Sequence, residues 1–120
     1  MRSIAEYLAP LASEAMHLRY IAHGTQREYL LPEELLEDAY TAIAKVRSNA
    51  PIASTLSEDA KVQVLALAPL LAAEVEGDVL NSCESAAAVI DHPVWRALRY
   101  QACVCLEVLN FDLAAWEADQ

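Results

Sequence analysis

The chain has 120 residues, with 18 acidic and 8 basic side chains that give a net charge of −10 at pH 7. Nucleic acids and anionic membranes are bound by clustered Lys and Arg, so this charge disfavours both as partners. Apolar residues make up 56% of the chain and only two residues are glycine, which favours helices over a turn-rich β fold. We therefore expect a single all-α domain over residues 1–120, a compact bundle of about five helices.

The first predicted helix begins at Ser3 and reaches about His23. Ser3 and Glu6 have the spacing of a capping box, in which each side chain accepts from the other's backbone N–H. Gly24 is the expected stop. Pro10 lies inside this segment, so we expect either a kink near Glu6 or a restart of the helix with Pro10 in its first turn.

The second predicted helix spans Pro32 to Ser48. Acidic residues fill its first turns, and Lys45 and Arg47 lie near its C-terminus, so both ends complement the helix dipole. Asn49 and Pro51 should end it.

The third predicted helix begins after Ser57, which is a good N-cap residue. From Val62 to Val75 only Gln63 and Glu74 are polar. A helix that is apolar all round is buried on every side, in its own core or against a partner. Pro69 should bend this helix or end it.

Two further helices are predicted after Gly77. The fourth is short and follows apolar residues at helical spacing: Val79, Cys83, Ala87 and Ile90. Pro93 disfavours helix at His92 and should start the last helix, which we expect to continue to about Trp116. Its core stripe would comprise Leu98, Ala102, Cys105, Leu109, Leu113 and Trp116.

The charges of the last helix oppose its dipole. Arg96 and Arg99 lie near the N-terminus, and three acids lie toward the C-terminus: Asp112, Glu117 and Asp119. One interpretation is that the arginines pair with acids of the same chain, such as those between Glu74 and Asp91. The other is a partner-binding patch made of residue types enriched in interface hot spots: Trp95, Arg96, Arg99 and Tyr100.

We predict no catalytic, cofactor-binding or metal site. Glu14 and His17 form an E-x-x-H pair, but a di-iron bundle needs two such motifs and two further carboxylates. Asp91 and His92 are better explained as capping groups at a helix boundary than as a base and its orienter. The three cysteines (Cys83, Cys103 and Cys105) lack the spacing of a zinc site or a C-x-x-C motif, so we expect buried thiols. The N-terminal residues lack the apolar run of a signal peptide, which predicts a cytoplasmic protein.

The apolar segments exceed what one small bundle can bury, and leftover apolar surface marks an interface. We therefore predict a homodimer and a non-enzymatic, protein-binding regulator that masks a surface of its partner. An acidic toxin-immunity protein is the alternative, and it would bind a basic nuclease site through four acids: Glu74, Glu76, Asp78 and Glu84. A third possibility is an enzyme with an unrecognised helical site that unites Glu14, His17 or His92 with other polar groups.

In its length, its five predicted helices and its lack of a catalytic motif, the chain resembles the QslA-like anti-activators of LuxR-type quorum-sensing regulators in bacteria. The resemblance implies a dimer that docks on the ligand-binding domain of such a transcription regulator. It also implies that docking disrupts the regulator's dimerisation and DNA binding. It assigns no functional residue.

Overall fold

The computed structural model describes residues 3–18, 32–77, 82–84 and 86–119, and every regular element within these ranges is a helix. The all-α prediction is thereby confirmed. Among the described helices, none combines the length and the apolar character needed to cross a membrane. The helices are α1 (Ile4–Ala12), α2 (Glu14–Met16), α3 (Pro32–Arg47), α4 (Glu58–Leu65), α5 (Leu67–Gly77), α7 (Ala86–Asp91), α8 (Pro93–Val108) and α9 (Leu113–Ala118).

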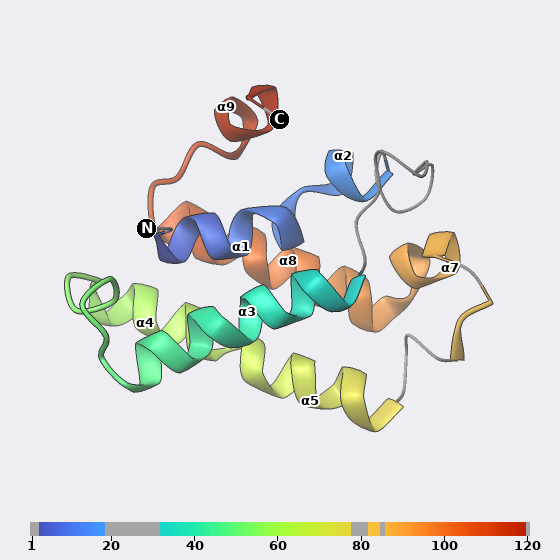
Figure 1. Cartoon of the computed structure of the whole chain (residues 1–120), viewed down its shortest axis with the longest axis horizontal. Helices are drawn as coiled ribbons and strands as arrows, with labels where there is room; N and C mark the ends of the chain where they lie inside the picture. Colours follow the sequence, from blue (N-terminus) through green and yellow to red (C-terminus); the bar gives the residue numbers. More distant parts are fainter. Residues whose placement is uncertain (1–2, 19–31, 78–81, 85, 120) are drawn as a thin grey trace.

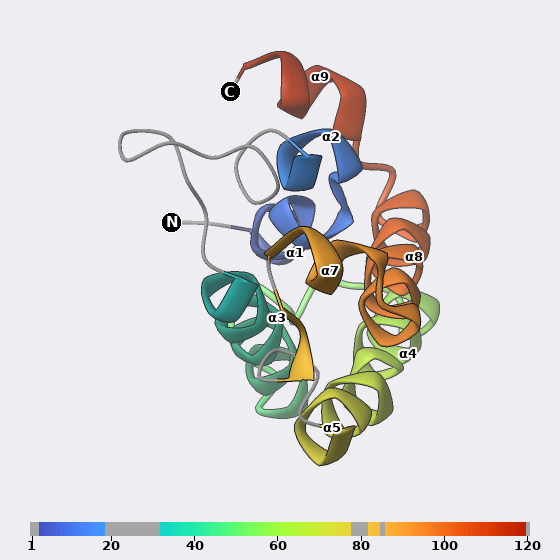
Figure 2. The same ribbon diagram turned by 90° about the vertical axis from the view of Figure 1, so that its right-hand side faces the viewer.

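Helix α8 packs against four other helices, namely α1, α4, α5 and α7 (Figure 1). Helix α3 packs on α1 and also contacts α4 and α5. Figure 2 shows α9 at one end of the molecule, beyond α1 and α2.

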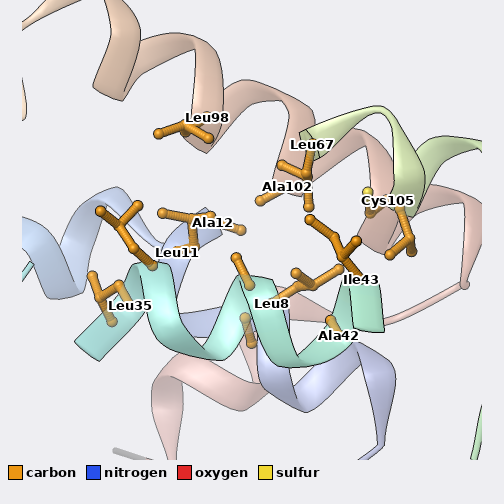
Figure 3. Packing of buried hydrophobic residues seen from close by; sticks show 14 of the residues in the cluster. Leu8, Leu11, Ala12, Leu35, Ala42, Ile43, Leu67, Leu98, Ala102 and Cys105 are labelled. Atoms are coloured by element: carbon orange, nitrogen blue, oxygen red, sulfur yellow. The ribbon is translucent and has the colours of Figure 1, made fainter. Parts of the chain in front are cut away.

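The core lies between α1, α3, α5 and α8 (Figure 3). Its residues repeat at three- and four-residue spacing on each helix, which places them on one side. A buried Leu side chain contributes about 1.5–3 kcal/mol relative to an exposed one, so these faces account for the association of the four helices. The residues labelled in Figure 3 are Leu8, Leu11, Ala12, Leu35, Ala42, Ile43, Leu67, Leu98, Ala102 and Cys105.

The first helix is shorter than predicted. Its capping box is confirmed, because Glu6 N donates to Ser3 Oγ at 3.2 Å and Ser3 N donates to Glu6 Oε1 at 3.3 Å. However, α1 passes through Pro10 and ends at Ala12, so the expected restart at Pro10 is wrong. The restart comes at Ser13, whose backbone is extended and whose Oγ accepts from Met16 N at 3.2 Å. The predicted stop at Gly24 lies outside the described residues.

Helix α3 agrees with its prediction at both ends. Asn49 has φ of 52°, in the left-handed region that asparagine tolerates at helix ends. Ala50 N donates to Lys45 O at 2.9 Å and Asn49 N to Val46 O at 3.2 Å. This Schellman pattern ends the helix where the sequence predicted.

The third predicted helix is two helices, α4 and α5, separated at Ala66. Ser57 caps α4 as expected, accepting from Ala60 N at 3.1 Å. Pro69 lies in the first turn of α5, where its missing N–H costs no helical hydrogen bond. In a continuous helix its ring would clash with the carbonyl of Leu65, four residues earlier, so the break at Ala66 agrees with the prediction that Pro69 ends the helix. The chain does not bury this segment on every side, because Val62 is 59% exposed. The fourth predicted helix is confirmed only as α7, and residues 79–81 lie outside the described part.

The prediction of one continuous last helix to Trp116 is wrong, because α8 ends at Val108. Asn110 has φ of 56°, Phe111 N donates to Leu106 O at 2.9 Å and Asn110 N donates to Glu107 O at 3.1 Å, again a Schellman pattern. Asp112 then caps α9 by accepting from Ala115 N at 3.0 Å. Asp112 is therefore not a misplaced C-terminal anion, since it lies at the positive end of the next helix.

Candidate functional site

The start of α8 is fixed by His92 and Pro93. His92 Nδ1 accepts a hydrogen bond from Val94 N at 3.2 Å, and Pro93 occupies the first turn. This confirms that His92 is a capping residue.

Trp95 lies in the core, with no exposed surface. Its indole Nε1–H donates to Nδ1 of His17 at 3.3 Å. The two ring centroids are 5.6 Å apart and the rings are tilted by 60°. Trp95 thus joins α8 to the segment after α1 rather than lying on the surface.

Both ring nitrogens of His17 have partners. Nδ1 accepts from Trp95, so Nε2 carries the proton and donates to the carbonyl oxygen of Pro10 at 2.8 Å. Burial lowers the pKa of His17, and the positive charge of Arg99 lowers it further, against opposing effects of the Pro10 hydrogen bond and Glu14. A neutral imidazole with both nitrogens engaged holds the end of α1 in place and has no free nitrogen for a substrate or a metal.

The arginines of α8 pair within the chain, as the first interpretation of their charges predicted. Arg99 Nη1 lies 3.5 Å from Glu14 Oε2, and Arg96 Nη2 lies 3.6 Å from Asp91 Oδ1. Asp91 belongs to the acidic stretch expected to pair with these arginines, whereas Glu14 comes from α2. The acid of each pair is exposed to solvent, so each pair contributes only about 0–1 kcal/mol.

The structure does not bring the four predicted patch residues onto one surface. Trp95 is buried, Arg99 lies beside α2, and Arg96 and Tyr100 are exposed. Among the residues that the structure describes, Tyr100 is the most accessible large apolar one, at 71% exposure. Partner binding by the surface members of this set stays a prediction.

The thiols of α8 are not activated. Cys103 Sγ donates to the carbonyl oxygen of Ala12 at 3.4 Å, and burial raises the pKa of Cys103. Burial also raises the pKa of Cys105 to about 12. Protonated thiols are poor nucleophiles. Within the described residues, no group of three or more His, Cys, Asp or Glu side chains could hold a metal ion.

Helix α9 is joined to the junction of α1 and α2 by one strong polar contact. Ser13 Oγ donates to Glu117 Oε2 at 2.7 Å, and the Ser13 side chain is fully buried. Leu113 and Trp116 of α9 also pack against the edge of the core. Glu117 therefore has a structural role that the sequence did not reveal.

A further surface feature is an apolar face shared by two helices. We define the α4–α8 face by four residues. Val62 belongs to α4 and Ala66 is the C-cap of α4, while Tyr100 and Val104 belong to α8. Val62, Ala66 and Tyr100 are exposed and Val104 is half-buried. Each pair has i, i+4 spacing, so its members lie on one side of their helix.

The two halves of the α4–α8 face are adjacent. Gln101 Nε2 donates to the backbone oxygen of Gln63 at 2.8 Å and to its side-chain Oε1 at 3.0 Å. These residues directly follow Tyr100 and Val62 in the chain, and because α4 and α8 run in opposite directions, Tyr100 and Val62 lie on the same side of the helix pair. Figure 2 shows α8 and α4 side by side along one edge of the molecule.

Acidic side chains lie at one end of this apolar face. Asp59 precedes Val62 by three residues and Glu107 follows Val104 by three, so each lies beside the face on its helix. Both are exposed. By contrast, Glu74, one of the four acids expected to bind a nuclease, is only 7% exposed, so it does not contribute to an acidic surface.

Comparison with protein-family models, with curated proteins and with solved structures finds no match.

Proposed function

We propose that this protein is a non-enzymatic regulator that binds another protein and masks part of its surface. The observation that carries the proposal is the α4–α8 face, in which Val62 and Tyr100 are 59% and 71% exposed. Single exposed apolar residues are common on soluble proteins. Apolar residues that are contiguous across two packed helices mark an interaction site.

The arrangement of polar groups supports a binding role rather than catalysis. His17 is engaged through both ring nitrogens, and the thiols of α8 have raised pKa values. The histidine and thiol side chains thus contribute to packing between helices, while the exposed α4–α8 face can make apolar contacts with a partner.

The first partner to test is a LuxR-type transcription regulator, whose dimerisation and DNA binding the chain would block. This choice rests on the resemblance in length and helix number described above. Homodimerisation of the chain is part of the same proposal, and sedimentation equilibrium at micromolar concentration tests it: a monomer would contradict it.

A reporter gene driven by a LuxR-type regulator tests the function. Co-expression of the chain should lower reporter output, and Val62→Asp should restore it because the new charge is desolvated on binding. Tyr40→Asp is the matched control, because Tyr40 is an exposed apolar residue on α3, outside the face. Unchanged output with the wild-type chain at equal expression would refute the anti-activator proposal.

A further inference from the structure

We propose that the α4–α8 face binds an amphipathic helical segment of a partner protein whose apolar residues are flanked by Lys or Arg. This inference rests on the proposed function and specifies the chemistry of the segment that is bound.

The shape of the face favours a helix as the bound element. Figure 1 shows α4 followed by α5 running in the direction opposite to α8, and α4 packs directly on α8. Val62 and Ala66 on one helix and Tyr100 and Val104 on the other form two short ridges at i, i+4 spacing. A helix that places its own apolar residues at i, i+3 and i+4 packs between such ridges.

The charges at the border of the face favour basic flanking residues on the partner. Asp59 and Glu107 are exposed beside the apolar residues, one on each helix. The cations of α4 and α8 do not balance them, because Lys61 lies 3.6 Å from Glu58 and the two arginines of α8 pair with Asp91 and Glu14. An incoming Lys or Arg would find both acids at the end of the face where α4 begins and α8 ends.

The same charges argue against a second copy of the chain as the occupant. Each chain has a net charge of −10, so a second copy repels the first, whereas a basic segment is attracted. Like charges at an interface suppress association. The homodimer proposed above would therefore use another surface.

The probe is a synthetic helical peptide of about 18 residues, roughly five turns, with leucine along one face and arginine on both borders. The comparison peptide carries glutamate in place of every arginine. Fluorescence anisotropy with the full chain should show the arginine peptide binding at least about tenfold more tightly than the glutamate peptide. Equal affinities, or no binding of the arginine peptide, would overturn the inference.

Two pairs of variants separate binding at the face from general attraction between opposite charges. Val62→Asp makes the chain more acidic, yet it should weaken binding of the arginine peptide at least about tenfold because it places a charge inside the apolar contact. Tyr40→Asp on α3 adds the same charge and should leave the affinity unchanged. Similarly, Glu107→Gln should weaken binding about threefold, whereas Glu37→Gln on α3 should have no effect.

Each contrary result has a distinct meaning. Equal affinities of Val62→Asp and Tyr40→Asp, at matched urea stability, would overturn the site. If the chain forms a dimer that Val62→Asp dissociates and Tyr40→Asp leaves intact, the face binds a second copy of the chain. That result would overturn the proposal of a basic helical segment as the partner. Reporter repression that persists while the peptide experiment fails would leave the proposed function standing and remove only this inference.

Discussion

A substitution of Trp95 tests most sharply whether this residue stabilises the core or contacts a partner. Its residue type suggests an interface hot spot, but its side chain is fully buried and bonded to His17. Trp95→Phe keeps an aromatic ring in the core and removes the indole N–H. We expect this variant to lose stability, with binding affected only through the loss of folded protein.

The expected cost has two parts. His17 Nδ1 would become a buried acceptor without a donor, which costs about 1–3 kcal/mol. The smaller ring buries less apolar area, roughly 40 Å² less, or about 1 kcal/mol at 25 cal/mol per Å². The sum of about 2–4 kcal/mol is a large share of the roughly 5–15 kcal/mol typical of a domain.

Urea unfolding followed by circular dichroism measures this cost as a lower midpoint at an unchanged slope. Tyr100→Ala is the surface control, because Tyr100 is 71% exposed, and its free energy of unfolding should change by no more than about 0.5 kcal/mol. A Trp95→Phe protein with wild-type stability that no longer binds its partner would refute the assignment of Trp95 to the core.

Three further predictions concern the polar groups. The pKa of His17 in the folded chain lies below the unfolded value of 6.5, so the unfolded state takes up the proton first and the free energy of unfolding should decline as pH falls below 6.5. The free energy of unfolding of His17→Gln, whose side chain does not titrate, should decline less over that range in urea melts. Equal declines for the two proteins would contradict this. Cys105 has a pKa of about 12, and its reaction with the thiol reagent DTNB can be followed in a variant whose other cysteines are changed to serine. At about pH 8 this thiol should react only as fast as the chain unfolds. Reaction at the rate of an unfolded thiol would contradict the burial of Cys105. Ser13→Ala should cost about 1–2 kcal/mol and speed hydrogen exchange in α9, whereas Ser48→Ala, at an exposed position directly after α3, should do neither. Unchanged exchange in α9 would show that the Ser13–Glu117 contact does not hold that helix.

The sequence predicted those features that depend on neighbouring residues. Capping at Ser3 and Ser57, the end of α3 at Asn49 and the capping role of His92 all follow from local backbone chemistry. The end of α8 at Asn110 was also signalled locally, since asparagine followed by Asp112 is a stop and a cap. The apolar spacing of Leu109, Leu113 and Trp116 continued through that stop and led to the prediction of one long helix.

The candidate site depends on contacts that no local pattern contains. Trp95 and His17 are 78 residues apart, and nothing near either residue indicates the other. Similarly, a segment that is apolar all round gives no sign of which side faces the core. Only the packing of α4 on α8 shows that Val62 lies outside, as Tyr100 does on the neighbouring helix.

The central claim is that the α4–α8 face binds a partner protein, and one affinity measurement tests it most directly. The purified ligand-binding domain of a LuxR-type regulator is immobilised, and the wild-type chain, Val62→Asp and Tyr40→Asp are each titrated by biolayer interferometry. We predict binding by the wild type, equal binding by Tyr40→Asp, and at least about tenfold weaker binding by Val62→Asp. Equal affinities for all three, or no binding by the wild-type chain, would contradict the claim.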